Sequence, residues 1–243
     1  MIELELCRTL TFSHHSARKF SHYYALHPNQ PRDMSQDEVI ISLGRRFRQD
    51  LLWRLRWNVL APVDNIEIAT GPPDQTTDLP LRDHPLASES LADPPLSCID
   101  EISIGDFTDK LDREMAMPKE WQFQPPATLK INNEDGAPIT LGQFVREVHE
   151  YVERNMDGIK KVKAEVYGKP CTDADGKHGG MSTFGRPTTL PDHIGIYFRR
   201  VWAFDEGGRV SVNVQLWAEG DLGITMERFW ATRLRQLPNY EPR

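Results

Sequence analysis

The sequence has few cysteines, no long apolar run and no overall excess of basic residues. Its three cysteines, Cys7, Cys98 and Cys171, lie far apart. This odd number and wide spacing exclude a dense disulfide framework and favour free thiols in a reducing compartment. No stretch approaches about 18 continuous apolar residues, so we expect no membrane span. The first residues are acidic where a secretory signal would be basic, so we predict a cytoplasmic or nuclear location.

The sequence also lacks the common catalytic and cofactor-binding signatures. It contains no nucleophile elbow, Walker loop, dinucleotide fingerprint or zinc-finger spacing. The segment 149–153 is spaced like a zincin helix, but Glu153 stands where that helix has its second histidine. We therefore interpret His149 as a histidine at the edge of the core, and we expect no metal and no cofactor. These absences favour a non-enzymatic interaction module whose partner is a protein.

Charge and proline are unevenly distributed along the chain. The net charge is −7, yet residues 1–60 carry nine Lys and Arg against six Asp and Glu, whereas residues 61–120 carry four against fourteen. Seven of the 18 prolines lie between positions 61 and 100. Proline restricts the backbone and removes hydrogen-bond donors. We expect 61–98 to be an acidic, proline-rich linker or long loop between an amino-terminal segment and a main domain over 99–243.

Helix signals occur at three places, and the first helix would be rich in arginine. Two capping boxes, at 35–38 and 140–143, each place a hydroxyl three residues before Glu or Gln. The first predicts a helix over about 36–60, preceded by an amino-terminal strand, and the second predicts a helix that begins near Leu141. Apolar spacing predicts a further helix over about 226–237. The arginines of the first helix do not share one face, so nucleic acid is an unlikely partner.

The strongest strand signal is a hairpin over about 194–216. Apolar residues alternate along 194–204 and again along 210–216, and Glu206-Gly207-Gly208 lies between the two runs. We predict an α+β fold, with a short antiparallel sheet that contains this hairpin and is packed by amphipathic helices. Arg200 interrupts the expected apolar face of the first strand, between Phe198 and Trp202.

A second functional hypothesis is an enzyme or a small anionic-ligand binder. The loop over 170–191 is rich in glycine and contains a lysine, and glycine-rich loops can bind phosphate through backbone amides. An arginine on an apolar strand face must reach solvent, pair with an acid, or hold a ligand carboxylate or phosphate. If a pocket lies beneath the loop, we expect His178, Arg186, His193 and Arg200 to line it.

One stretch resembles part of an uncharacterised domain that recurs in fungal proteins. The resemblance covers about residues 126–152 and consists of the proline-led strand 126–131, the turn at Gly136 and the box and helix over 138–149. Gln143 departs from the acidic residue that is usual in that family. The resemblance indicates a fungal origin, and it implies no catalytic residue and no ligand.

Overall fold

The structure, a computed structural model, describes residues 47–237 apart from 73–74, 168, 173–177, 183–188 and 207. At the end of helix α6 and in strands β6 and β7, only the backbone is described. All described residues belong to one compact unit of the chain, Val39–Arg243. The expected amino-terminal strand and the first capping box lie outside the described residues.

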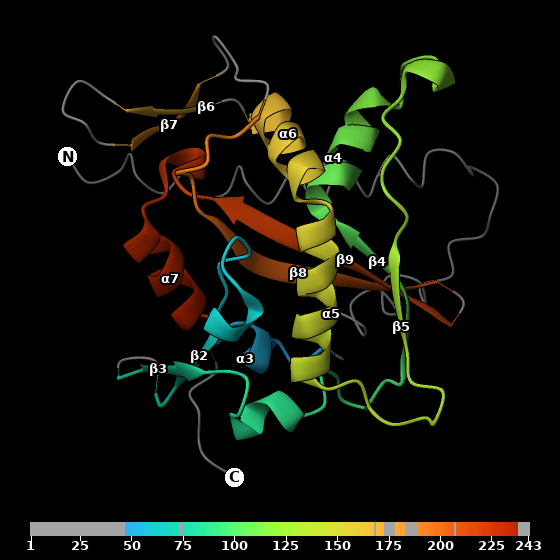
Figure 1. Cartoon of the computed structure of the whole chain (residues 1–243), viewed down its shortest axis with the longest axis vertical. Helices are drawn as coiled ribbons and strands as arrows, with labels where there is room; N and C mark the ends of the chain where they lie inside the picture. Colours follow the sequence, from blue (N-terminus) through green and yellow to red (C-terminus); the bar gives the residue numbers. More distant parts are fainter. Residues whose placement is uncertain are drawn as a thin grey trace, which may run out of the picture. The chain divides into compact units, whose positions relative to one another are not determined.

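The described residues form an α+β fold, as the sequence predicts (Figure 1). The helices are α3 (Gln49–Leu52), α4 (Gly105–Glu114), α5 (Leu141–Arg154), α6 (Met156–Tyr167) and α7 (Met226–Leu234), with 3-10 turns η1 (Val63–Asn65), η2 (Pro85–Ser88), η3 (Lys119–Trp121) and η4 (Asp221–Gly223). The strands are β1 (Leu55–Arg56), β2 (Glu67–Thr70), β3 (Thr77–Pro80), β4 (Cys98–Ile104), β5 (Leu129–Asn132), β6 (Lys169–Thr172), β7 (His178–Ser182), β8 (Ile196–Glu206) and β9 (Arg209–Ala218).

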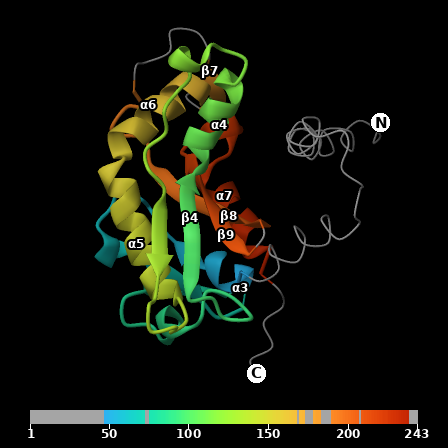
Figure 2. The same ribbon diagram turned by 90° about the vertical axis from the view of Figure 1, so that its right-hand side faces the viewer.

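The main sheet has four strands in the order β5-β4-β9-β8. The predicted hairpin is confirmed, because β8 and β9 pair antiparallel through most of their length. The sheet is mixed, however, since β4 pairs parallel with β9. Strands β1, β2 and β3 form a separate antiparallel sheet, and β6 pairs with β7. Figure 2 shows α5 and α6 lying along the main sheet on the side away from α3.

A β-bulge in β8 changes which side chains enter the core. Phe198 pairs with Leu216, but Arg200 pairs with Gln215, so one extra residue is accommodated between these pairs. Before the bulge Phe198 is buried, and after it Val201 takes the buried face. Arg200 therefore lies on the opposite face, which we call the outer face. The expectation that Arg200 interrupts the apolar face is wrong, because the bulge reverses the alternation of side chains.

Only the Thr140 half of the predicted second capping box forms at the start of α5, because the Gln143 side chain bonds elsewhere. The Thr140 hydroxyl accepts a hydrogen bond from the Gln143 amide at 3.2 Å, as expected for this motif. The Gln143 side chain binds Asn133 and Glu147. From this start, one face of α5 is fully buried against the core, through Phe144, Val145, Val148 and Val152.

The long helix expected over 36–60 is not formed in its described part. Only α3 is helical there, and the chain then continues as β1. Leu55, Trp57 and Val59 are buried and alternate with more exposed neighbours, a period typical of a strand. The amide of Val59 donates to the Ile196 carbonyl, and the amide of Phe198 donates to the Trp57 carbonyl, each at 2.9 Å. These tertiary hydrogen bonds override the local helix propensity.

The segment 61–98 differs from the expected linker or long loop. It contains β2 and β3, and Ile66, Ile68 and Leu91 within it are buried in the core. Two of its prolines occupy positions that need no amide donor in a ladder or helix: Pro62 lies before η1, and Pro85 begins η2. High proline content therefore marks short turns in this packed segment.

Arg233 joins three parts of the fold. Its side chain is buried, and its guanidinium donates to the carbonyls of Leu52, Leu55, Phe198 and Arg199. The charge lies near the rings of four aromatic residues, Trp53, Phe198, Phe229 and Trp230. Burial lowers the pKa of Arg233 to about 9, so the group stays charged at neutral pH. Helix α7 is thereby fixed to β8 and to the turn between α3 and β1.

Replacement of Arg233 by methionine should destabilise the protein. Each buried carbonyl left without a donor costs about 1–3 kcal/mol, and removal of a buried charge offsets part of that loss. We expect the free energy of unfolding, measured by urea denaturation, to fall by about 3 kcal/mol. The exposed Arg235 offers a matched control, since Arg235→Met should change stability by less than about 0.5 kcal/mol. Equal effects of the two substitutions would contradict this role.

His149 is buried and accepts a hydrogen bond. Trp57 Nε1 donates to His149 Nδ1 at 3.2 Å, and the Trp57 ring stacks on Phe198 with 5.2 Å between centroids. Burial lowers the pKa of His149, although Glu153 and Glu150 act in the opposite direction. Protonation would remove the acceptor that Trp57 uses, so the folded protein favours the neutral ring.

Stability should therefore depend on pH through His149. Below the ordinary histidine pKa of 6.5 the unfolded chain binds a proton that the folded protein does not, so the free energy of unfolding falls as the pH falls. His149→Gln keeps a carbonyl acceptor for Trp57 and cannot titrate. Urea denaturation across about pH 5–7.5 should show a smaller pH dependence for this variant than for the wild type. Identical pH profiles would exclude His149 as the cause.

Candidate functional site

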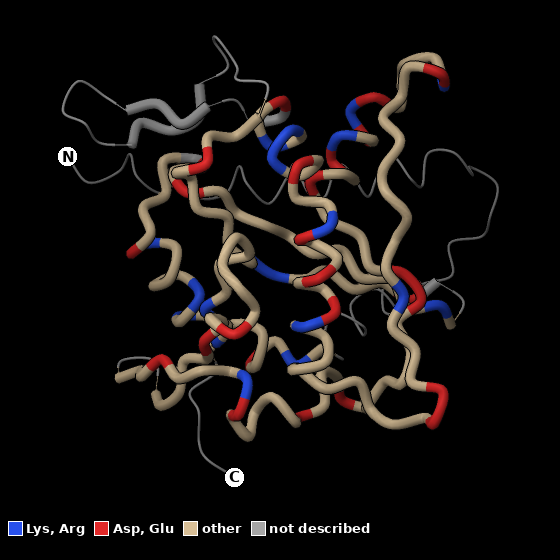
Figure 3. The backbone as a smooth tube through the Cα atoms, in the orientation of Figure 1, with Lys and Arg blue, Asp and Glu red and all other residues tan. Residues whose placement is uncertain are grey.

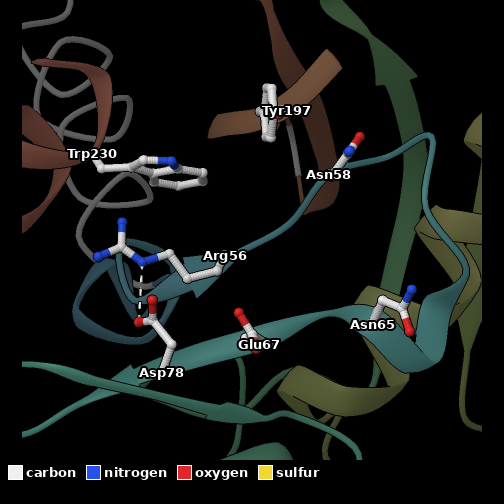
Figure 4. A pocket seen from close by; sticks show the side chains of 7 residues that line it. All are labelled: Arg56, Asn58, Asn65, Glu67, Asp78, Tyr197 and Trp230. Atoms are coloured by element: carbon white, nitrogen blue, oxygen red, sulfur yellow. Dashed lines mark hydrogen bonds and ion pairs between the residues drawn. The ribbon is translucent and has the colours of Figure 1, made fainter. Parts of the chain in front are cut away.

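A pocket lies where the three-stranded sheet meets the start of β8 and helix α7. Its volume is about 330 Å³. Seven side chains line it (Figure 4): Arg56, Asn58, Asn65, Glu67, Asp78, Tyr197 and Trp230. We call it the Arg56 pocket. Its residues come from six separate elements and the turn after β1, so only the folded chain brings them together.

Arg56 is held on two sides at the pocket wall. Its Nε donates to Asp78 Oδ1 at 3.2 Å, and its guanidinium lies 4.5 Å from the centroid of the Trp230 ring. The Arg56 side chain is only 13% exposed, whereas that of Asp78 is 40% exposed. Nη1 of Arg56 is buried and has no hydrogen-bond partner among the described residues. The ion pair with Asp78 neutralises the arginine, and one donor remains available.

Two aromatic rings form one wall of the pocket, and Arg56 lies against one of them, Trp230. Tyr197 and Trp230 meet edge to face, with 5.8 Å between centroids and an angle of 88°. Behind them, Phe229 stacks on Trp217 at 4.2 Å and anchors α7 to β9. Gly195 makes room for Tyr197, because a Cβ at this glycine would lie 2.6 Å from the tyrosine ring. Burial raises the pKa of Tyr197, and the nearby Glu219 raises it further, so its hydroxyl keeps its proton.

The remaining lining residues offer polar groups without partners in the described part of the chain. Asn58 uses its carbonyl to accept from the Leu60 amide at 3.0 Å, which leaves its amide nitrogen available. Glu67 is exposed, and Figure 4 shows it across the pocket from Trp230 and Tyr197, pointing into the space between them. With Asp78 paired to Arg56, Glu67 gives the pocket a net charge of −1. The pocket therefore favours a cationic group that can contact aromatic rings.

A second depression, of about 390 Å³, lies at the start of α5. Arg82, Ala87, Ser88, Thr140, Gly142, Gln143 and Arg146 line it. Its polar groups are largely engaged: Thr140 caps the helix, and Arg82 pairs with Asp64 at 2.9 Å. This depression therefore presents fewer available groups than the Arg56 pocket.

Of the four residues predicted for an anion site, two have described side chains, His193 and Arg200. Arg186 and the side chain of His178 lie outside the described residues, although the His178 backbone belongs to β7. His193 is exposed in the turn before β8, next to Asp192, which pairs with Lys160. Arg200 lies seven residues further along, roughly 20 Å of extended chain away. Neither His193 nor Arg200 lines the two pockets described above. The site beneath the 170–191 loop stays a prediction.

The described residues offer neither a cluster of metal ligands nor a helix that could span a membrane. In this part of the chain, no group of three or more His, Cys, Asp and Glu side chains is placed to hold a metal ion. Of the helices described, none has the length and apolar character needed to cross a membrane. Comparison with protein-family models, curated proteins and solved structures finds no match to this chain.

Proposed function

We propose that this protein is a non-enzymatic interaction module of the cytoplasm or nucleus that binds a basic side chain of a partner protein in the Arg56 pocket. The observation that carries the proposal is the carboxylate of Glu67, which has no partner among the described residues and faces Tyr197 and Trp230 across the pocket. An aromatic face attracts a cation through its quadrupole, and a nearby carboxylate adds a charge-assisted hydrogen bond.

The charge balance of the pocket supports a cationic ligand. An anion would be drawn to Arg56, but Asp78 already pairs with that guanidinium and Glu67 would repel the anion. A lysine or arginine side chain instead meets one free carboxylate and the amide groups of Asn58 and Asn65. The amide oxygen of Asn65 can accept from such a side chain. The pocket thus matches a donor-rich, positively charged group.

The lining residues support binding in preference to catalysis. None of the seven is a serine, cysteine or histidine that could act as a nucleophile or general base near neutral pH. A pair of carboxylates could divide acid and base roles, but Asp78 is committed to Arg56. Val63 and Leu79, two exposed apolar residues, lie close in sequence to Asn65 and Asp78. Such apolar positions around a polar pocket suit contact with a protein surface.

The proposal predicts selective binding of basic peptides. Short capped peptides that contain one lysine or one arginine should shift the Trp230 indole N–H signal in NMR titrations, and a glutamate peptide of equal length should not. Glu67→Gln should weaken binding by about tenfold, because a charge-assisted hydrogen bond becomes a neutral one. Added salt should weaken binding to the wild type more than to this variant.

Glu153→Gln provides the matched control, since Glu153 is an exposed acid on α5 that does not line the pocket. It should bind the basic peptides as the wild type does. Equal weakening by both substitutions would indicate a general charge effect. Binding of the glutamate peptide as tightly as the basic ones would contradict a cationic ligand.

A further inference from the structure

The outer face of the main sheet carries a second group of polar side chains, distinct from the Arg56 pocket. Trp202 of β8 pairs with Asn213 of β9, and Asn213 pairs with Ser103 of β4, so these three residues form one row across three strands. Arg200 lies two pairs along β8 from Trp202, on the same face and opposite Gln215. Strand β8 carries Arg199 and Arg200 next to each other. Figure 3 shows where basic and acidic residues lie along the backbone of the described residues. We call this group the Arg200 cluster.

Hydrogen bonds order the centre of the cluster. Asn213 Nδ2 donates to Ser103 Oγ at 3.2 Å and to Thr108 Oγ1 at 3.0 Å, and Gln215 donates to the Asn213 carbonyl. Because both hydroxyls accept from Asn213, each keeps its own hydrogen as a donor. No acceptor for either hydrogen is present among the described residues. Two hydroxyl donors therefore lie around one side-chain amide, on the face of the sheet that also carries Arg200.

Gly105 allows α4 to begin beside this group. A Cβ at Gly105 would lie 2.2 Å from Gln215 Nε2 and 2.9 Å from Asn213 Oδ1. The first turn of α4 thereby carries Thr108 over the sheet. A larger residue at this position would displace the amides that orient the two hydroxyls.

The charge of the Arg200 side chain is not paired with any carboxylate among the described residues. Its guanidinium lies 4.2 Å from the centroid of the Trp202 ring, so it leans along β8 toward the row of Trp202, Asn213 and Ser103. It pairs with no carboxylate among the described residues, and its Nε is buried without an acceptor. Burial, together with Arg199, lowers the pKa of Arg200 to about 10. A buried donor left unpaired costs about 1–3 kcal/mol, which a ligand acceptor would recover.

We propose that the Arg200 cluster binds an oxyanion, the phosphate or carboxylate group of a small molecule, between the Arg200 guanidinium and the hydroxyls of Ser103 and Thr108. The cluster presents donors from three strands and one helix, and its described side chains include no acid. The contact with Trp202 holds the guanidinium on this face, and a guanidinium can bind an oxyanion through two parallel hydrogen bonds. The site is independent of the Arg56 pocket, which selects the opposite charge.

Calorimetric titration of the full-length protein tests the proposal, with inorganic phosphate, pyrophosphate and succinate as probes and chloride at matched ionic strength as the reference. Saturable binding of phosphate or pyrophosphate would identify a phosphate site, and preference for succinate a carboxylate site. Arg200→Gln should weaken the preferred anion by at least about tenfold, and Arg200→Lys should give an intermediate loss because it cannot bind bidentately. Ser103→Ala with Thr108→Val should weaken it by about fivefold.

Arg209→Gln is the matched control, because Arg209 lies on the same sheet but is exposed and pairs with Glu101 at 2.8 Å. It should leave anion binding unchanged. Thermal melting of each variant checks that it folds. If Arg200→Gln does not fold, anion binding by the variant that combines Ser103→Ala with Thr108→Val tests the proposal instead. Absence of saturable binding by the wild type, or unchanged affinity in a folded Arg200→Gln or hydroxyl variant, would overturn the proposal.

Discussion

The buried guanidinium of Arg233 is the interaction on which the arrangement of the Arg56 pocket depends. A charge in the core is costly unless its donors are satisfied. Here four backbone carbonyls and surrounding aromatic rings take the place of a carboxylate. The carbonyls belong to the α3–β1 turn and to β8, while the arginine belongs to α7. Those are the segments that carry Arg56, Tyr197 and Trp230, so one contact sets the spacing of the pocket walls.

A second buried charge connects the helices at the other end of the sheet. Lys163 of α6 donates to Asp106 Oδ1 at 2.9 Å and to the Leu216 carbonyl at 3.0 Å. Burial raises the pKa of Asp106, and the charge of Lys163 opposes that shift. The pair fixes the start of α4 against α6 and β9, and this start also carries Thr108 of the Arg200 cluster. Replacing one partner of such a pair lowers stability by more than the intact pair contributes, because the other charge then stays buried without a partner.

The elements that sequence reasoning predicted correctly are those governed by local signals. The hairpin follows from alternation around Gly207-Gly208, and α5 and α7 follow from Thr140 and Thr225 as helix caps. The bulge in β8 has no comparable signal, and it moved Arg200 to the outer face. The alternation of Leu55, Trp57 and Val59 was present in the sequence, but the apolar spacing and capping box upstream favoured a helix.

The candidate site was harder to predict, for a physical reason. Arg200 could be singled out because a charge within an apolar run is visible locally. The Arg56 pocket joins β1, β2, β3, β8 and α7, so its members share no spacing along the chain. Asp78 and Glu67 also fell in the segment expected to be a linker, where acids indicate solvent exposure. Only the pairing of β1 with β2 and the position of α7 bring these side chains together.

The most direct test of this account is the contact between Trp230 and Arg56 in the presence and absence of Arg233. Nuclear Overhauser effects between the Trp230 indole and the Arg56 side chain should be observed in the wild-type protein, where the guanidinium lies 4.5 Å from the ring centroid. In Arg233→Met protein that still shows the β8–β9 cross-strand effects, we expect the Trp230–Arg56 effects to be lost. Their persistence at wild-type intensity would contradict the claim that Arg233 sets the pocket walls.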